Sequence, residues 1–543
     1  MMPTTNKIIV QTVEGQLQGC IKENLDGEKF FCFLGVPYAQ PPVGNLRFKD
    51  PRPLQKWSGI KDATKEGEPF IQKDTLITMT NLVFGGEDGL HLNLFTKKLN
   101  SQESKLNPVM VWIHGGGFRE GRNNTDVHGP EFLMLEDIVL VCINYRLGIL
   151  GSLKLDDPSL EVPGNAGLKD QIEALKWIQR NIRNFGGDPK NVTIFGESAG
   201  AASVHFLVLS PLAKGLFHRA ILQSGSAINN WAVGPKFLPK ILAAANKKNV
   251  SEKEALDYLR SLSLRELLHM QVNNTDAFGG SYSPMIEKES PTACITKEPI
   301  EYITSGEYNK VPMMMGYCSF EMLFIKALFP EELKYYNHEM IFSKSLKIDE
   351  TDNLVQNYLP KLKEHYEENE RGSLELASDA FFSMGVIGAA INHAKTSNQP
   401  VYLYQFSLDT ERNYVKVKKN IKDRGKICQR KYHLWLNKFA ILGCSHLDDT
   451  GYLFKTTLPL PRKGSEADKY VRRIVKLWTS FAKYGKPTLE TDYGTVDWKP
   501  VERDVTYYVD IDKKSELKIN PKREKVEFWK RVYRENSSTA NYL

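Results

Sequence analysis

A serine stands between two glycines in the segment NVTIFGESAGAAS, residues 191–203. The β-branched and aromatic residues Val192–Phe195 are typical of a buried strand, and small residues then lead into an apolar helical segment. A G-x-S-x-G motif at such a turn is a nucleophile elbow, which lifts the hydroxyl clear of the strand ends. Gly196 and Gly200 suit the turn because larger side chains would collide with the neighbouring elements. The pattern predicts that Ser198 is a nucleophile, with a structural turn serine as the alternative.

Three glycines follow a second apolar run, in the segment His114–Phe118. Glycines let backbone N–H groups face a ligand without interference from side chains. A developing oxyanion needs such donors, and lipases and esterases use an HGGG segment for them. A phosphate-binding loop is the rival interpretation, but the G-x-x-x-x-G-K-[ST] and G-x-G-x-x-G motifs of such loops are absent.

A serine nucleophile needs a base, and in this arrangement the chain order is nucleophile, acid, histidine. His446 lies in a small polar loop between apolar segments, where a side chain can reach a cleft. This order excludes the histidines up to His218. The remaining candidates besides His446 lie in charged or amphipathic stretches and are predicted to be on the surface: His269, His338, His365, His393 and His433. Glu321 follows an apolar run and suits a histidine-orienting role, but a solvated loop acid is an equally good interpretation.

Nearly continuous apolar runs must supply the strands that position these residues. They occupy residues 109–113, 138–145, 192–195, 219–223, 311–316 and 401–406. Such runs indicate strands that are covered on both faces. Residues 167–186 have helical periodicity and end at two glycines. The alternation predicts an α/β fold with a mostly parallel, twisted central sheet and helices on both faces, in a single domain spanning residues 1–543.

The composition is ordinary for a soluble globular protein, with 41% hydrophobic and 25% charged residues among 543. The net charge is +7, and the densest basic stretch is Lys416–Lys431. It is predicted to be a solvated surface segment, with a membrane-surface or acidic-partner contact as the alternative, and no nucleic-acid binding is expected. No secretion signal is recognised, and no apolar run approaches the roughly 20 residues of a membrane span. Seven cysteines without C-x-x-C spacing predict neither zinc nor a disulfide framework, so a cytoplasmic location is expected.

Taken together, these motifs resemble the type-B carboxylesterase/cholinesterase family of α/β-hydrolases. The resemblance covers nearly the whole chain. It includes FLGVPYAQPPVGNLRF, EDGLHLNLF, HGGGF, NYRLGILG, FGGDPKNVTIFGESAG, QSGS, FEMLF, SHLDDTGYLF and LWTSFAKYGKPT. The segments SHLDDTGYLF and INNWA are most similar to those of insect α-esterase-type carboxylesterases.

The resemblance implies a catalytic triad of Ser198, Glu321 and His446. It further implies an oxyanion hole, a substrate pocket, supporting residues around the triad and two structural ion pairs. The implied oxyanion hole consists of the N–H groups of Gly116, Gly117 and Ala199, and the implied substrate pocket contains Trp231 and Phe118. The implied supporting residues are Glu197 and Ser224, and Ser224 is expected to hydrogen-bond the acid. The implied ion pairs are Arg47–Glu87 and Arg146–Asp170. The triad chemistry requires no metal or cofactor.

Several departures from the family pattern bear on function. Gly89 and Phe70 stand where family members carry two bonded cysteines, which agrees with a reducing compartment. Met79 replaces a choline-binding tryptophan, so recognition of a quaternary ammonium group is not expected. Met322 replaces the glycine after the acid, and GESAG in place of GQSAG argues against a specialised juvenile hormone esterase.

The expected function is therefore that of a serine carboxylesterase, which hydrolyses xenobiotic or lipid-derived esters through an acyl-enzyme. Detoxification and insecticide resistance are roles that such an enzyme could serve. The alternative is a low-turnover protein that sequesters insecticide-like esters and organophosphates. A cholinesterase-like adhesion protein is disfavoured because Ser198 is present.

Overall fold

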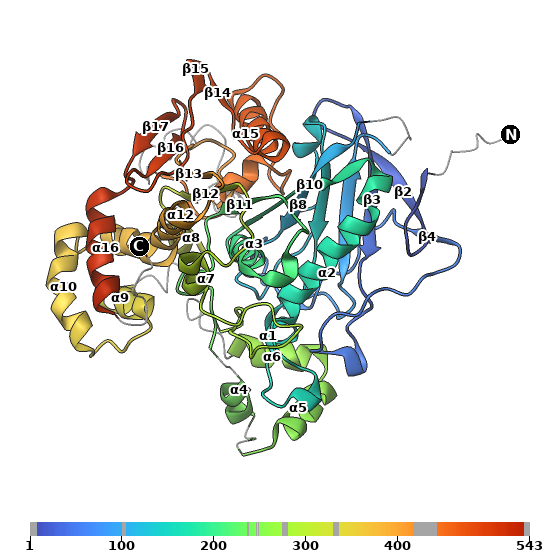
Figure 1. Ribbon diagram of the computed structural model, residues 1–543, viewed down its shortest axis with the longest axis horizontal. Coiled ribbons are helices and arrows are strands. Elements are labelled where there is room, and N and C mark those ends of the chain that lie inside the picture. The colour runs from blue at the N-terminus through green and yellow to red at the C-terminus, as the bar shows by residue number, and fades with distance from the viewer. Residues whose placement is uncertain are drawn as a thin grey trace, which may run out of the picture.

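A computed structural model describes residues 8–99, 105–235, 238–245, 247, 249–273, 281–328, 336–415, 443–536 and 543. A 13-stranded sheet runs through the molecule, with helices packed around it (Figure 1). Its strands are β1 (Ile8–Gln11), β2 (Gln16–Glu23), β3 (Lys29–Pro37), β4 (Ile60–Asp62), β7 (His91–Thr96), β8 (Asn107–Ile113), β9 (Val139–Ile143), β10 (Gly187–Glu197), β11 (Arg219–Gln223), β12 (Met313–Cys318), β13 (Val401–Phe406), β16 (Tyr507–Ile511) and β17 (Glu516–Ile519). Two small hairpins pair β5 (Gln72–Lys73) with β6 (Val83–Phe84) and β14 (Leu489–Thr491) with β15 (Gly494–Val496).

The centre of the sheet is parallel, as the apolar runs predict. The strand order is β1-β2-β3-β7-β9-β8-β10-β11-β12-β13-β16-β17, and every pairing from β9 to β16 is parallel. The antiparallel pairings lie toward the two edges, and β4 pairs with β2. The predicted strands 219–223 and 401–406 have the observed bounds of β11 and β13.

The helices are distributed along the chain between these strands. They are α1 (Gly148–Ser152), α2 (Ala166–Asn181), α3 (Ala199–Leu209), α4 (Leu238–Ala244), α5 (Glu252–Ser261), α6 (Leu264–Asn273), α7 (Pro299–Ser305), α8 (Leu323–Leu328), α9 (His338–Leu346), α10 (Asn353–His365), α11 (Glu370–Ser378), α12 (Met384–Thr396), α15 (Glu466–Tyr484) and α16 (Arg523–Glu535). The predicted helix 167–186 is α2 with a further short turn, and Gly186 ends it with φ 77°.

The sheet has a hydrophobic core on each face. Alternate residues of β8 point to opposite sides, so that Val109, Val111 and Ile113 belong to one cluster and Met110 and Trp112 to the other. The first cluster includes residues of α2, α3 and α12, whereas the second includes most of the apolar stripe of α15. Helices therefore cover both faces, and the predicted α/β fold is confirmed.

Among the described residues, one helical stretch is long and apolar enough to cross a membrane. It spans Glu370–Thr396, and its most apolar window has a mean hydropathy of 1.4. The prediction that no apolar run approaches the length of a membrane span is therefore wrong for this stretch. However, 89% of this window is buried inside the protein, as in the core helix of a globular fold.

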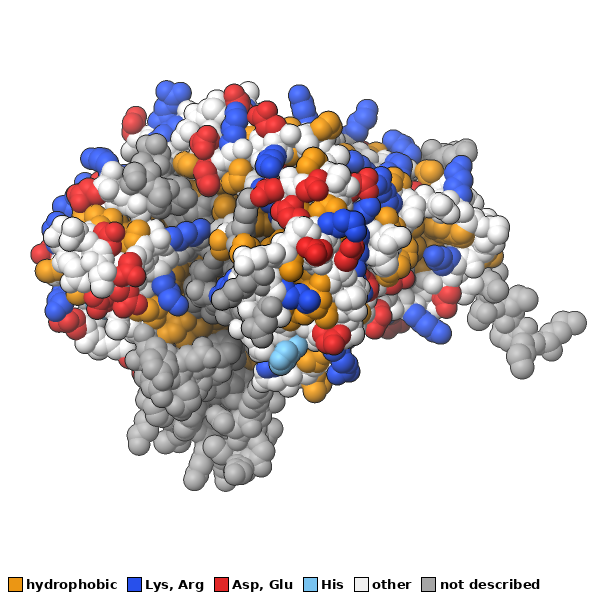
Figure 2. All heavy atoms as spheres, turned by 90° about the horizontal axis from the view of Figure 1, so that it is seen from below, with side chains coloured by type: hydrophobic (Ala, Val, Ile, Leu, Met, Phe, Trp, Pro, Cys, Tyr) orange, Lys and Arg blue, Asp and Glu red, His pale blue; other side chains and the backbone are white. Residues whose placement is uncertain are grey.

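The face shown in Figure 2 carries basic and acidic side chains interspersed with small hydrophobic areas. No broad region of a single charge dominates this face. The stretch Lys416–Lys431 lies outside the described residues, so its predicted exposure stays a prediction.

Candidate active site

Ser198 occupies a tight turn between the end of β10 and the start of α3. Its backbone has φ 58° and ψ −123°, a conformation that costs a residue with a side chain about 1–3 kcal/mol. A Cβ on Gly196 would lie 2.6 Å from the carbonyl oxygen of Ile113, and a Cβ on Gly200 would lie 2.0 Å from the same oxygen. The strand–turn–helix geometry predicted around Ser198 is therefore present, and close packing explains both glycines.

The glycine-rich segment after β8 lies directly against this turn. A Cβ on Gly115 would lie 3.1 Å from the Cβ of Ser198. Gly116 and Gly117 have φ values of 110° and 60°, which residues with side chains rarely adopt. Within the described ranges, neither glycine's N–H has a hydrogen-bond acceptor, and Ala199, the first residue of α3, has no intrahelical acceptor. These three N–H groups are free to bind an anion.

Glu321 holds His446 at two points. Nδ1 of the imidazole lies 2.7 Å from Oε2 of Glu321, and the backbone N–H of His446 donates to the Glu321 carbonyl oxygen at 3.0 Å. The other carboxylate oxygen accepts the N–H of Cys318, at the end of β12, at 2.7 Å. Both side chains are buried. This arrangement fixes the imidazole ring and leaves Nε2 as its chemically available nitrogen.

Nε2 of His446 faces a second carboxylate. It lies 3.0 Å from Oε1 of Glu197, the residue that precedes Ser198. The contact lacks hydrogen-bond alignment, since Oε1 has no hydrogen-bond partner in the described part of the chain. The imidazole therefore packs against the nucleophile turn, and its Nε2 is not committed to Glu197.

The protonation states of this pair depend on each other. Burial raises the pKa of Glu197 to about 8. Burial lowers the pKa of His446, but the charges of Glu197 and Glu321 outweigh burial and raise it to about 9. A proton on Glu197 removes one of those charges and lowers the pKa of His446 again. A protonated Glu197 thus favours the neutral imidazole that a general base requires.

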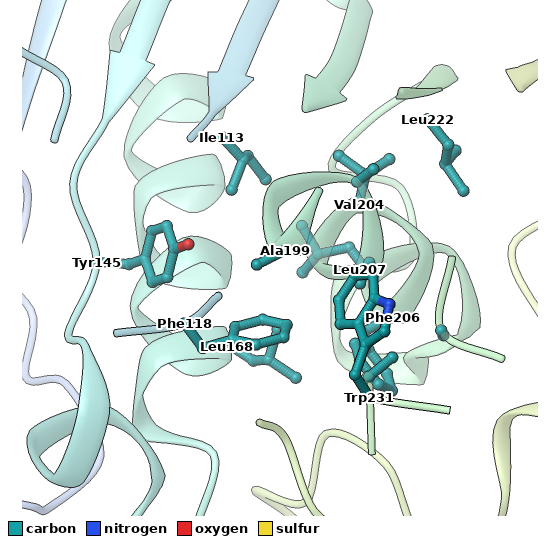
Figure 3. Packing of buried hydrophobic residues seen from close by; sticks show 14 of the residues in the cluster. Ile113, Phe118, Tyr145, Leu168, Ala199, Val204, Phe206, Leu207, Leu222 and Trp231 are labelled. Carbon is teal, nitrogen blue, oxygen red and sulfur yellow. The ribbon is translucent and has the colours of Figure 1, made fainter. Parts of the chain in front are cut away.

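A row of aromatic side chains runs from the glycine-rich segment to the histidine. The ring centroids of Phe118 and Trp231 are 6.5 Å apart, and those of Trp231 and Phe382 are 5.9 Å apart. The Phe382 and Phe324 centroids lie 4.5 and 5.6 Å from that of His446. Figure 3 shows Phe118 and Trp231 near each other. The two predicted substrate-binding residues therefore belong to one apolar wall.

Sequence reasoning does not identify Phe324 or Phe382. Phe324 stands three residues after the acid, on α8, and this proximity is the one signal that the sequence offers. Phe382 lies in a π-helical turn, Asp379–Ser383, between α11 and α12. The Phe381 carbonyl oxygen in that turn accepts the indole N–H of Trp231 at 2.7 Å. Only the folded chain brings this turn to the site.

Ser224 lies beside the acid without binding it. Its hydroxyl donates to Sγ of Cys318 at 3.8 Å, whereas the resemblance implies a hydrogen bond to Glu321. The Glu321 carboxylate instead accepts the Cys318 backbone N–H and pairs with His446. Ser224 thus supports the acid indirectly, through Cys318.

Asp449 is a further buried carboxylate near the histidine, and the sequence alone does not identify it. Its Oδ2 accepts a hydrogen bond from Gln223 Nε2 at 2.8 Å, and Gln223 Oε1 accepts the indole N–H of Trp478 at 3.0 Å. Burial raises the pKa of Asp449 to about 6. Its position three residues after His446 is the only sign in the sequence that Asp449 lies near the site.

The structural pairs that the resemblance implies are present. Arg47 and Glu87 form an ion pair with an Nη2–Oε2 distance of 2.7 Å, and Arg146 and Asp170 form another with Nη2–Oδ1 at 2.6 Å. A Cβ on Gly89 would lie 2.8 Å from the ring of Phe70, so an aromatic contact occupies the place of the family's paired cysteines.

The predicted surface position is wrong for His338 and His393, which are both buried. His393 Nε2 lies 2.8 Å from Nε2 of His205 on α3, and His205 Nδ1 accepts the N–H of Ala227 at 3.0 Å. His393 is buried because α12 packs against α7 and β13, so this side chain does not face water. Across the described residues, no group of three or more His, Cys, Asp or Glu side chains could hold a metal ion.

Comparisons with known proteins agree with this architecture. Residues 6–529 match the Carboxylesterase family. The chain is 34% identical over 520 residues to a carboxylic ester hydrolase of Bombus ignitus, covering 92% of this chain and 89% of that protein. It is 32% identical to esterase FE4 of Myzus persicae, over 91% of this chain and 87% of that protein.

A solved structure is also similar over nearly the whole chain. The crystal structure of juvenile hormone esterase from Manduca sexta, with OTFP covalently attached, has a TM-score of 0.84 and 29% identity, covering 97% of this chain and 99% of that one. With the elbow, the free N–H groups and the Glu321–His446 pair in place, these matches show that the chain is a carboxylic ester hydrolase of the carboxylesterase family, with the α/β-hydrolase fold.

Proposed function

We propose that Ser198 is the nucleophile of this hydrolase, with His446 as its base and Glu321 as the acid that orients the base. The observation that carries the proposal is the position of the imidazole. Glu321 binds Nδ1 at 2.7 Å, and Nε2 lies 3.0 Å from the residue that precedes Ser198. A serine hydroxyl is a poor nucleophile at neutral pH, so a base held in this place supplies the activation that it needs.

The reaction proceeds through a covalent intermediate. Ser198 Oγ attacks the ester carbonyl carbon while His446 Nε2 takes the hydroxyl proton, and Glu321 stabilises the imidazolium that forms. The free N–H groups of Gly116, Gly117 and Ala199 stabilise the oxyanion, and the loss of one such donor typically costs about 10²–10³ in rate. His446 then returns the proton to the leaving alcohol. Water repeats the cycle on the acyl-enzyme and releases the carboxylate.

The aromatic wall favours esters with apolar groups, of xenobiotic or lipid-derived origin. Phe118, Trp231, Phe324 and Phe382 present ring surface and only one indole N–H, which is already bonded. Met79, at the position of a choline-binding aromatic residue, is buried and offers no ring face for a quaternary ammonium group. Detoxification of insecticide-like esters is a role that fits this apolar wall.

We place the enzyme in the cytoplasm. The six cysteines in the described part of the chain form no disulfide, and the contact between Phe70 and Gly89 needs no oxidising environment. Cell fractionation with an antibody against the native chain tests this location, and recovery of the enzyme in a secreted or luminal fraction contradicts it.

The proposed nucleophile is tested by the change Ser198→Ala, assayed with p-nitrophenyl esters of increasing acyl length. We expect a loss on the order of 10⁶ in kcat. The matched control is Ser203→Ala, which removes a buried hydroxyl, bonded to Gln171, from α3 just after the turn. Near-native hydrolysis by the Ser198 variant contradicts the assignment.

The wild-type time course separates turnover from sequestration. Continued release of p-nitrophenol over many equivalents supports catalysis. One equivalent of product followed by negligible release indicates a protein that sequesters esters, and this contradicts the proposed hydrolytic cycle.

A further inference from the structure

Two cysteines face each other across the antiparallel strands β2 and β3. Cys20 pairs directly with Cys32, and the register continues through Ile21 and Lys22 to the pair of Glu23 with Lys29. Directly opposed residues point to the same face of a sheet, with Cα atoms about 4.5–5.5 Å apart. Disulfides join Cα atoms about 4.4–6.8 Å apart, so this pairing brings the two thiols within bonding reach without moving the strands.

The two thiols differ in exposure. Cys32 is fully buried in the core beneath α15, whereas Cys20 packs against that core from its rim and is partly exposed. Cys32 lies directly opposite Cys20 in the strand register, and Lys22 lies two residues after Cys20 on the same strand. The neighbouring Cys32 thiol and the charge of Lys22 outweigh burial and lower the pKa of Cys20 to about 7, whereas the Cys20 thiol and burial raise the pKa of Cys32. Cys20 is thus the reachable and reactive partner.

We propose that Cys20 and Cys32 form a thiol–disulfide modification site, which a small disulfide such as glutathione disulfide converts to a cross-strand disulfide. The Cys20 thiolate attacks one sulfur of the small disulfide, and the first small thiol leaves. Cys32 then attacks the Sγ of Cys20 and loses its proton, and the second small thiol leaves. The protein loses two hydrogens, and the small disulfide is reduced to two thiols.

Three other cysteines, which are buried, serve as internal controls. Cys142, Cys294 and Cys318 are at most 2% exposed, and burial raises the pKa of each thiol. An oxidant therefore does not reach them in the folded protein. The strands β7, β9 and β8 separate β3 from β10, which carries Glu197, so the modification is expected to leave ester hydrolysis intact.

The test is peptide mass spectrometry on the native full-length protein. The protein is exposed to glutathione disulfide at pH 7.5, quenched with acid, alkylated after unfolding and digested with trypsin. Cys20 lies in the tryptic peptide 8–22, and Cys32 lies in the peptide 30–47, because cleavage occurs after Lys22 and Lys29. We expect these two peptides joined by one disulfide, which dithiothreitol separates, and alkylated peptides for the three buried cysteines.

Variants distinguish a closed pair from simple thiol modification. With Cys20→Ser, we expect an alkylated Cys32 and no oxidised product. With Cys32→Ser, we expect Cys20 to stop at the mixed disulfide with glutathione, since the second attack is missing. Hydrolysis of a p-nitrophenyl ester confirms that each variant is folded. A wild-type product that remains a Cys20–glutathione disulfide, or that keeps both thiols, overturns the proposal.

Discussion

Glu197 places its carboxylate 3.0 Å from Nε2 of His446, on the side of the ring opposite the bond to Glu321. The histidine therefore lies between two buried carboxylates, and only one of them binds it with hydrogen-bond alignment. Glu321 sets the orientation of the ring, whereas Glu197 sets how readily the ring takes up a proton. Each role is open to a separate test.

The change Glu197→Gln removes a negative charge that raises the pKa of His446. The base works only when it is unprotonated, so activity rises with pH through its apparent pKa. We expect the acid limb of the kcat/KM profile to move to lower pH in this variant, and pH titration of ester hydrolysis measures it. An unmoved or alkaline-shifted limb contradicts this role for Glu197.

Trp231→Phe reduces the volume of the aromatic wall and removes the hydrogen bond to the Phe381 carbonyl oxygen. We expect relatively faster hydrolysis of esters with longer or branched acyl groups, by several-fold in kcat/KM. The matched control is Trp57→Phe, since the Trp57 indole also donates one hydrogen bond to a carbonyl oxygen, that of Gln16, but lies outside the site. An identical acyl preference in both variants contradicts the assignment of Trp231 as a substrate-binding residue.

Phe382 lies in a π-helical turn, and Asp379 of the same turn links it to the start of the C-terminal helix α16. Figure 1 shows α16 beside α10. Its carboxylate binds Lys522 Nζ at 2.6 Å, Ser383 Oγ at 2.7 Å and Tyr366 Oη at 3.0 Å. Removing one partner of a buried pair costs about 3 kcal/mol, and we expect Asp379→Asn to lose about that much stability in urea unfolding.

The same variant is expected to raise KM more than it lowers kcat, because Phe382 moves while the triad stays in place. The exposed pair Lys253–Asp257 serves as the control, and Asp257→Asn should change neither stability nor KM. Unchanged stability in the Asp379 variant contradicts this linking role.

Much of this arrangement could be predicted from the sequence, because the signals are local. The apolar runs locate β11 and β13 to the residue, and the glycines around Ser198 are recognisable by their spacing. The missing parts depend on contacts between distant segments. Phe382 reaches His446 only through the packing of α12, and His393 is buried because α12 packs against α7 and β13, where it also meets His205 on α3. The pairing of Cys20 with Cys32 likewise depends on strand register, which composition does not reveal.

The buried pair of His205 and His393 should make the fold sensitive to acid. Burial lowers the pKa of His205 to about 3 and also lowers that of His393, so both stay neutral in the folded state. The unfolded chain binds these protons below pH about 6.5, and the stability contributed above that pH is lost as the pH falls toward 3.

When the pH is lowered from 7 to 5, the free energy of unfolding should fall by about 2 kcal/mol less in His393→Gln than in the wild type. Urea unfolding at both pH values measures this difference. The exposed His269 on α6 provides the control variant His269→Gln, which should follow the wild type. Equal losses in all three proteins contradict this account of the pair.

The identity of the nucleophile is tested most directly by locating the residue that an organophosphate labels. The enzyme is inactivated with diethyl p-nitrophenyl phosphate and digested with trypsin, and the peptide 191–214, which also contains Ser203 and Ser210, is fragmented. The structure predicts one diethylphosphoryl group, on Ser198, at full loss of activity. A label on either neighbouring serine, or at any other residue, with Ser198 unmodified in the inactive enzyme contradicts it.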